Sequence, residues 1–182
     1  MWIPITAFIC YDILDLGKQL MPIGMLVVLD SILNRITQNR AKGKNTFIFI
    51  DEIYLLFQHE YSANFLFTLW KRVRKYGAYA TGITQNVGRP FLQSPYSENY
   101  ACKTASFLIM LNQASTDRIE LAKLLNISDL QLSYITNVDA GHGLIKVGSS
   151  LVPFANKFPK NTKLYKLMTT KPGEVHNPCP IL

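Results

Sequence analysis

Two adjacent carboxylates, Asp51 and Glu52, directly follow the apolar segment Thr46–Ile50, which has the composition of a buried β-strand. Ligands of open α/β sheets bind at the carboxyl ends of the strands, where this acid pair falls. In a nucleoside triphosphatase, an acid at such a strand end holds Mg²⁺ or its water shell. A second acid beside it can be the general base for the attacking water. A strand followed by an ordinary acidic turn would give the same pattern.

Polar side chains also end the next expected strand, Ala78–Thr84, where Thr84 and Gln85 stand together. In a parallel sheet with right-handed crossovers this strand end lies near the first one. Thr84 is therefore a candidate cofactor-binding residue. Gln85 can both donate and accept hydrogen bonds, so it could contact the γ-phosphate and the catalytic water. Alternatively, Thr84 and Gln85 are ordinary capping residues in a β–α turn.

Arginines occur at two places from which they could reach the nucleotide of a neighbouring molecule. Arg72 and Arg74 close the helix before the second strand, and Arg118 opens the helix after the third. A guanidinium inserted in trans can neutralise the charge that develops during phosphoryl transfer. For the basic run Lys71–Lys75, a solvated helix end that complements the helix dipole is an equally good explanation.

The phosphate-binding loop of such enzymes, GxxxxGK[ST], occurs nowhere in the 182 residues. Gly43-Lys44-Asn45 has the wrong residue after the lysine and no glycine five positions earlier. The backbone amides and the lysine of the loop do most of the phosphate binding. We therefore expect this chain alone not to hold ATP tightly.

Apolar runs and helical spacing predict the elements that position these residues. The expected strands are Ala7–Asp12, Thr46–Ile50, Ala78–Thr84 and Ala105–Leu111, with a hairpin over Gly143–Phe154. The expected helices are Leu16–Arg40, Tyr61–Tyr76 (stopped by Gly77), Ser115–Leu125 (capped by Ser115 or Thr116) and Ser128–Ile135. Pro22 and Gly24 would delay the proper start of the first helix to about Ile23. Residues 86–104 are expected to be irregular.

Strands without a polar face are typical of parallel sheets covered by helices on both faces. Together with the strand–helix alternation, they predict an α/β fold with a mostly parallel sheet flanked by helices and a C-terminal β-hairpin. The length suits one domain. We expect it to span residues 1–168, with a flexible tail over 169–182.

The composition, 48% hydrophobic with a net charge of +7, indicates a folded and basic protein. The charge is compatible with nucleic acid or an anionic membrane surface as partner, and equally with a mildly basic cytoplasmic protein. The three cysteines lack metal-site spacing and fit a reducing compartment. The apolar stretch Ile23–Leu33 is interrupted by Asp30 and shorter than the roughly 20 residues that span a bilayer. With no signal-peptide features at Met1, membrane association is expected to be peripheral only.

Four blocks occur in an order known from one family: FIFIDEIYLLF, WKRVRKYGAYATGITQNV, FLIMLNQASTDRIELAKLL and GHGLIKVGSSLVPF. From Ala7 to Pro172 the chain resembles conjugation and type IV secretion ATPases of the TraE/TrbE/CagE type. These are equivalent to the fourth VirB component, and the forms on conjugative elements of Gram-positive bacteria are the most similar.

The wider HerA/FtsK superfamily implies a RecA-like P-loop NTPase core in a hexameric ring, with ATP and Mg²⁺ as cofactors. By this resemblance Asp51 and Glu52 fall on the Walker B acids, with Asp51 holding Mg²⁺ through water. Gln85 falls on the sensor glutamine. Arg118 falls on the arginine of a DSR-like segment that acts as a trans finger, and Arg74 is the second finger candidate.

The chain departs from the family pattern in two places. The family's phosphate loop lies upstream of the segment matched here, so the chain resembles a truncated reading frame, a fragment or an excised domain. Gly88-Arg89-Pro90 and Pro95-Tyr96 stand where the family pattern would have a more regular helix after Gln85.

The leading hypothesis is the C-terminal part of a bacterial motor that energises conjugative DNA transfer or type IV secretion. It would be cytoplasmic and peripheral at the inner face of the cell membrane, with ATP, other channel subunits, copies of itself and DNA as candidate partners. The alternatives are a non-catalytic DNA-binding or assembly module derived from such an ATPase, and another HerA/FtsK-type DNA-translocating ATPase. Salt-dependent DNA binding through Lys71, Arg72 and Lys75 would favour the non-catalytic module.

Overall fold

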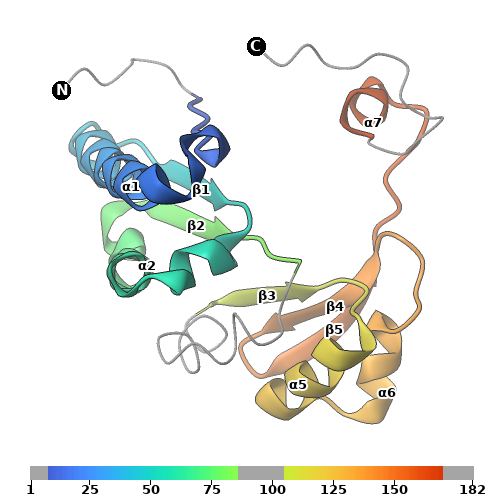
Figure 1. Cartoon of the computed structure of the whole chain (residues 1–182). Helices are drawn as coiled ribbons and strands as arrows, with labels where there is room; N and C mark the ends of the chain where they lie inside the picture. The colour runs from blue at the N-terminus through green and yellow to red at the C-terminus, as the bar shows by residue number, and fades with distance from the viewer. Residues whose placement is uncertain (1–7, 86–104, 170–182) are drawn as a thin grey trace. The chain divides into compact units, whose positions relative to one another are not determined.

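The computed structural model describes residues 8–85 and 105–169 (Figure 1). The chain divides into two compact units, Met1–Ala105 and Ser106–Leu182, and each is described by itself. The expected irregular segment over 86–104, with its Gly-Arg-Pro sequence, lies outside the described residues. The expected tail lies outside them from residue 170 onward. The expected single domain over 1–168 stays a prediction.

The first unit is a parallel pair of strands with helices between and before them. Its elements are η1 (Leu14–Leu16), α1 (Gly17–Ala41), β1 (Thr46–Ile50), η2 (Ile53–Gln58), α2 (Glu60–Arg72), η3 (Val73–Tyr76) and β2 (Ala78–Gly82). The strands pair in parallel from Thr46 opposite Ala78 to Ile50 opposite Gly82. Gly77 ends η3 in the left-handed conformation, φ 64°, as expected for a helix stop.

One face of the β1–β2 pair carries the core of this unit. Ile48 of β1 and Ala78 of β2 are buried together with side chains from α1, α2 and η3. These partners are Ile36, Leu69 and Val73. A second cluster joins Met25 of α1 to η2 and α2. Burial of aliphatic side chains contributes roughly 1.5–3 kcal/mol each, so these contacts fix α1 and α2 against the strands.

The other face of the same strands is open within the unit. Phe47, Phe49 and Tyr79 are 65%, 70% and 54% exposed, and the rings of Phe47 and Tyr79 stack with their centroids 5.0 Å apart. Burial on both faces was expected from the apolar sequence. Within this unit the described helices pack on one face only, so half of each strand's apolar surface has no cover there.

The expected strand at Ala7–Asp12 is wrong, because residues 8–13 have no regular structure. The expected late start of the first helix is also wrong, because α1 begins at Gly17 with Pro22 inside it. Proline removes one backbone donor and strains the preceding turn. Met21 and Met25, on either side of it, pack on the first unit's core and offset that loss.

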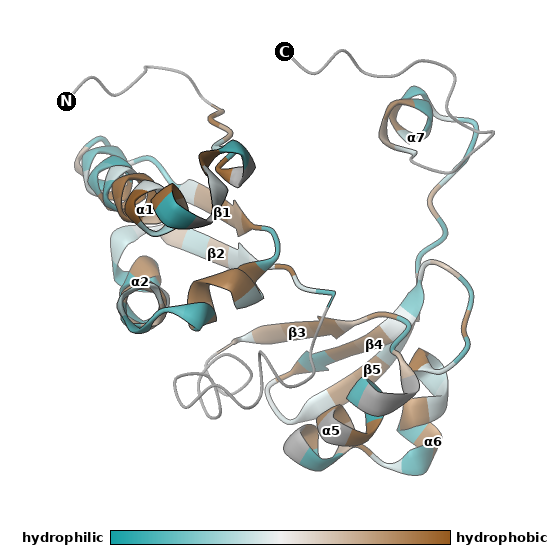
Figure 2. Ribbon diagram, in the orientation of Figure 1, coloured by the Kyte–Doolittle hydropathy of each residue, from teal (hydrophilic) through white to brown (hydrophobic). Residues whose placement is uncertain are grey.

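Helix α1 is longer and more extensively apolar than the expected stretch Ile23–Leu33, and peripheral membrane association stays a prediction. Its Gln19–Ala41 segment is long and apolar enough to cross a bilayer, by length and composition only. Figure 2 shows that its apolar residues gather toward its start, whereas its end is hydrophilic. Met25, Leu29 and Ile36 are nevertheless buried in this structure, so one side of the helix is used for packing within the unit.

The second unit is a three-stranded antiparallel sheet with short helices. Its elements are β3 (Phe107–Met110), α5 (Ser115–Leu125), α6 (Asp129–Leu132), η4 (Ser133–Ile135), β4 (His142–Val147), β5 (Ser150–Ala155) and α7 (Lys163–Met168). The strand order is β3-β4-β5, and the expected C-terminal hairpin is confirmed as β4–β5. The α/β class is confirmed as well. The described strands, however, form a small parallel sheet and a separate antiparallel one, since β3 pairs with the hairpin.

Helix starts in this unit are fixed in two different ways. Helix α5 has Ala114 as its N-cap and no side-chain cap hydrogen bond, so neither Ser115 nor Thr116 is the cap. Helix α6 begins with a capping box in which Ser128 and Gln131 satisfy each other's backbone N–H groups. The expected acid in the first turn of α5, Asp117, is confirmed.

Candidate functional site

The ends of β1 and β2 are held side by side beyond the strands themselves. The Ile83 N–H donates to the Ile50 carbonyl at 2.8 Å, and the Ile53 N–H donates to the Ile83 carbonyl at 3.0 Å. The two chain segments therefore leave the sheet at the same edge, with their backbones interlocked. This places the acid pair and the Thr84–Gln85 pair together at the carboxyl edge of a parallel sheet, as the sequence predicts.

Glu52 is the most unusual residue of this edge. Its backbone is left-handed, φ 47° and ψ 46°, which costs an L-residue with a side chain roughly 1–2 kcal/mol. Its Oε2 atom is buried and has no hydrogen-bond partner in the described structure. Its own N–H donates to Asp51 Oδ1 at 3.0 Å. Left-handed non-glycine residues and unsatisfied buried polar atoms both occur preferentially at functional sites, so the two features together make Glu52 a candidate site residue.

The neighbours of Glu52 at this edge are accessible. Asp51 and Gln85 are exposed and Thr84 is half-buried. No group of three or more His, Cys, Asp or Glu side chains gathers anywhere in residues 8–85 or 105–169. The exposed carboxylate of Asp51 suits Mg²⁺, which keeps several waters and takes its remaining ligands from phosphates. The donor set thus fits a magnesium–nucleotide complex better than a protein-only metal cage.

Glycine in place of Glu52 is expected to stabilise the chain by about 1 kcal/mol. The gain is the relieved left-handed strain, reduced by the larger backbone entropy that glycine gives the unfolded chain. Urea unfolding followed by Trp70 fluorescence measures it, in a Trp2→Phe background that leaves one tryptophan. Asn126→Gly is the control, because Asn126 has a similar φ of 54° but asparagine tolerates it. A loss of stability in Glu52→Gly would contradict the strain argument.

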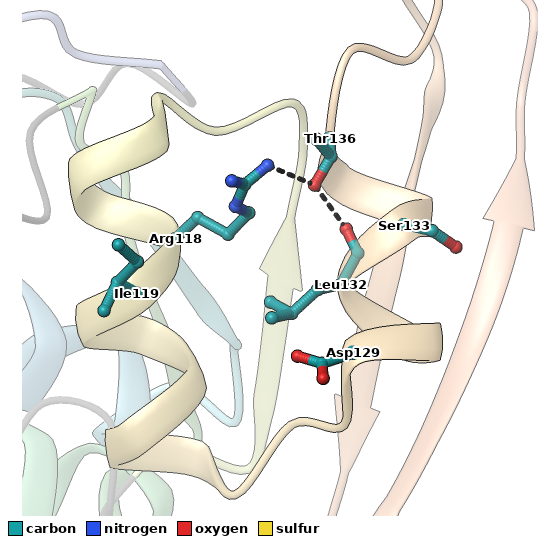
Figure 3. Close-up of a pocket in the computed structure, with 6 residues that line it drawn as sticks. All are labelled: Arg118, Ile119, Asp129, Leu132, Ser133 and Thr136. Atoms are coloured by element: carbon teal, nitrogen blue, oxygen red, sulfur yellow. Dashed lines mark hydrogen bonds between the residues drawn. The ribbon is translucent and has the colours of Figure 1, made fainter.

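Arg118 is half-buried in the second unit and lies in a pocket between α5 and the α6–η4 segment (Figure 3). Its Nη1 donates to Thr136 Oγ1 at 3.1 Å, and Thr136 Oγ1 donates to the Leu132 carbonyl at 2.6 Å. Because the Thr136 hydroxyl donates its hydrogen to the Leu132 carbonyl, its oxygen lone pairs are left to accept the hydrogen bond from the Arg118 guanidinium. This hydrogen bond could not be predicted from the sequence, because Thr136 lies 18 residues away from Arg118 along the chain.

Arg74, the second finger candidate, is exposed in η3 and precedes β2. It therefore stands at the amino end of the strand whose carboxyl end leads to Gln85. Within its own unit Arg74 does not join the acid pair. Action on a neighbouring molecule's nucleotide stays a prediction for both arginines.

A parallel strand pair with helices on one face, and with acids and an amide at its carboxyl edge, is the arrangement expected around the phosphates in an α/β nucleoside triphosphatase. The sequence model of the TraG P-loop domain matches residues 5–145, which is most of the chain, and the chain belongs to this family. The resemblance to conjugation and type IV secretion ATPases of the TraE/VirB4 type is thereby confirmed.

A solved structure supports the same fold. VirB4 of Thermoanaerobacter pseudethanolicus is similar to this chain with a TM-score of 0.68 and 23% sequence identity. The similarity covers 79% of this chain but only 39% of that one, so the chain spans well under half the length of its structural relative. No curated protein matches the sequence.

Proposed function

We propose that this chain is the C-terminal part of an ATP-hydrolysing domain that energises conjugative DNA transfer or type IV secretion. The single observation that carries the proposal is Glu52. It has a left-handed backbone and an unpartnered buried carboxylate oxygen. It stands at the carboxyl edge of a parallel strand pair in a member of a P-loop family. This is where a general base for phosphoryl transfer to water would be required.

The side chains of the site have separate roles in this proposal. Glu52 accepts a proton from the attacking water, and Asp51 holds the water shell of Mg²⁺. Thr84 contacts the nucleotide, and Gln85 hydrogen-bonds the γ-phosphate and so senses its presence. Mg²⁺, when bound with ATP, neutralises charge on the phosphates. Arg118, or Arg74 in its place, supplies a guanidinium to the nucleotide of the neighbouring subunit in a homo-hexamer.

The open face of β1–β2 supports the view that these residues are only part of such a domain. Parallel sheets are covered on both faces, and an isolated two-stranded sheet is marginal in water. The remainder of the ATPase domain, including the strand and helix that flank a GxxxxGK[ST] loop, would cover Phe47, Phe49 and Tyr79. The assembled protein would work in the cytoplasm, peripherally at the inner face of the membrane.

The decisive experiment compares this chain with a version extended upstream by the loop-bearing segment of a family member. We expect no Mg²⁺-dependent ATP hydrolysis and no tight ATP binding by the 182-residue chain, because the phosphate loop provides most of the binding. The extended protein should bind ATP tightly and hydrolyse it in the presence of Mg²⁺. Phosphate release and nucleotide titration calorimetry measure these outcomes. Robust hydrolysis by the short chain, or an extended protein that folds and binds ATP yet never hydrolyses it, would overturn the proposal.

A further inference from the structure

Arg118 shares its pocket with a carboxylate that could neutralise it. The pocket has a volume of about 420 Å³, and its lining includes Arg118 from α5, Asp129 from the start of α6 and Thr136 after η4. Figure 3 shows the guanidinium pointing toward Thr136 and away from Asp129. The cation is thus hydrogen-bonded to a neutral hydroxyl, although an acid lies in the same pocket.

Thr136 is held firmly in place as the acceptor of this hydrogen bond. Its own hydroxyl hydrogen is donated to the Leu132 carbonyl at 2.6 Å. The neighbouring Ile135 is fully buried, and its carbonyl accepts the Gln113 N–H at 2.9 Å. These contacts tie the end of η4 to the segment that leads into α5. Thr136 therefore has a fixed position relative to the helix that carries Arg118.

Asp129 is the weaker partner for the guanidinium. It is exposed in the first turn of α6, and exposed ion pairs contribute little because water and salt screen them. A hydrogen bond from a charged donor to a fixed, half-buried hydroxyl is stronger. The Thr136 hydroxyl therefore determines which way the Arg118 side chain points.

We infer that Thr136 is a positioning residue, which keeps Arg118 away from Asp129 and available to a phosphate group of the neighbouring subunit's nucleotide. The inference rests on the trans role of Arg118 in the proposed function. A hydroxyl orients the guanidinium without neutralising it, whereas a carboxylate would compensate the charge that acts on the phosphates. The hydrogen bond uses the Nη1 end, so the edge formed by Nε and Nη2 can still pair side-on with two oxygens of one phosphate.

Crystal structures of the 182-residue chain test the positioning itself. Valine in place of Thr136 keeps the branched shape and suits the extended backbone there, φ −120° and ψ 116°, but it has no hydroxyl. In Thr136→Val we expect the Arg118 guanidinium to lie within roughly 4 Å of the Asp129 carboxylate, the range of an ion pair. A guanidinium that keeps its original position would overturn the inference. This result needs no ATPase activity, so it is decided separately from the proposed function.

Turnover by the loop-extended protein tests whether this positioning matters for catalysis. We expect Thr136→Val to lower kcat about 10- to 100-fold, because a misplacement of roughly 1 Å can cost as much. The dissociation constant of ATP should stay within about threefold of the parent, because the phosphate loop provides that affinity. Thr136→Ser should keep kcat within about threefold, because its hydroxyl can make the same hydrogen bonds.

The Asp129→Asn background separates steering of Arg118 from a purely structural effect of Thr136. The asparagine amide is neutral, so it cannot compensate the guanidinium. In this background Thr136→Val should lower kcat by less than about threefold, because the competing carboxylate is gone. An equal loss of kcat with and without Asp129→Asn would overturn the inference, as would a kcat of Thr136→Val equal to that of the parent.

Thr162→Val is the matched control in the same unit. The Thr162 hydroxyl donates to the Pro159 carbonyl at 2.9 Å and accepts the Tyr165 N–H at 3.2 Å. The variant thus loses one donated and one accepted hydrogen bond, as Thr136→Val does, but none to an arginine. Its kcat should equal that of the parent, and a loss as large as that of Thr136→Val would overturn the inference.

Arg118→Ala distinguishes failure of this inference from failure of the proposed function. If turnover depends on Glu52 but is unchanged by Arg118→Ala, the trans role of Arg118 is excluded and the inference about Thr136 fails with it. The proposed ATPase activity would stand in that case. If Arg118→Ala lowers kcat about 10³-fold or more, as expected for a trans arginine, the Thr136 variants decide the inference.

Discussion

Glutamine in place of Glu52 is expected to lower ATP turnover by the loop-extended protein about 10²–10⁴-fold, the usual contribution of a general base. The amide has nearly the same shape as the carboxylate but cannot accept a proton from water. Binding of ATP should stay within about threefold of the parent, because the phosphate loop rather than Glu52 provides that affinity. Steady-state phosphate release gives kcat, and calorimetric titration gives the dissociation constant.

Glu60→Gln is the matched control for this substitution. Glu60 is an exposed acid in the first turn of α2, so it undergoes the same chemical change away from the strand ends. The kcat of the loop-extended Glu60→Gln variant should equal that of its parent. Unaltered turnover in Glu52→Gln, or the same loss in both variants, would remove Glu52 from the role of base. Comparison with Glu52→Gly separates chemistry from strain, since both variants lose the base and only the glycine relieves the backbone.

Local features of the fold could be predicted well from sequence. Both β1 and α5 have their expected bounds, and Gly77 ends the helical segment before β2. Each of these features is determined by a short stretch of sequence: an apolar run for β1, helical spacing for α5, and a residue that tolerates positive φ at Gly77. The position of the acid pair beside Thr84 and Gln85 could be predicted too, because right-handed crossovers fix which strand ends meet.

Features that depend on distant partners could not be predicted. Nothing in the residues around Pro22 reveals that packing of Met21 and Met25 keeps α1 intact. The apolar run of β3 does not encode whether its partner is parallel or antiparallel, and it pairs with β4 of the hairpin. The left-handed conformation of Glu52 is equally hidden, because glutamate has no preference for it. Tertiary contacts decide all three.

Alanine in place of Phe49 is expected to have an effect that depends on how much of the ATPase domain is present. In this chain Phe49 is 70% exposed, so its removal should change the free energy of unfolding by less than about 0.5 kcal/mol, as for other surface substitutions. In the loop-extended protein the same ring would be covered, and its loss should cost about 3–5 kcal/mol. Urea unfolding of both proteins, followed by Trp70 fluorescence in the Trp2→Phe background, gives the two values.

Leu66→Ala calibrates this comparison. Leu66 is 2% exposed in the core of the first unit, so its truncation should cost about 2–5 kcal/mol in both the short and the extended protein. The ratio of the Phe49 effect to the Leu66 effect therefore reports burial of the open face, independently of overall stability. A Phe49 effect that stays small in an extended protein able to hydrolyse ATP would mean that the loop-bearing segment does not cover Phe49. The open face of β1–β2 would then be available to a partner other than the rest of its own domain.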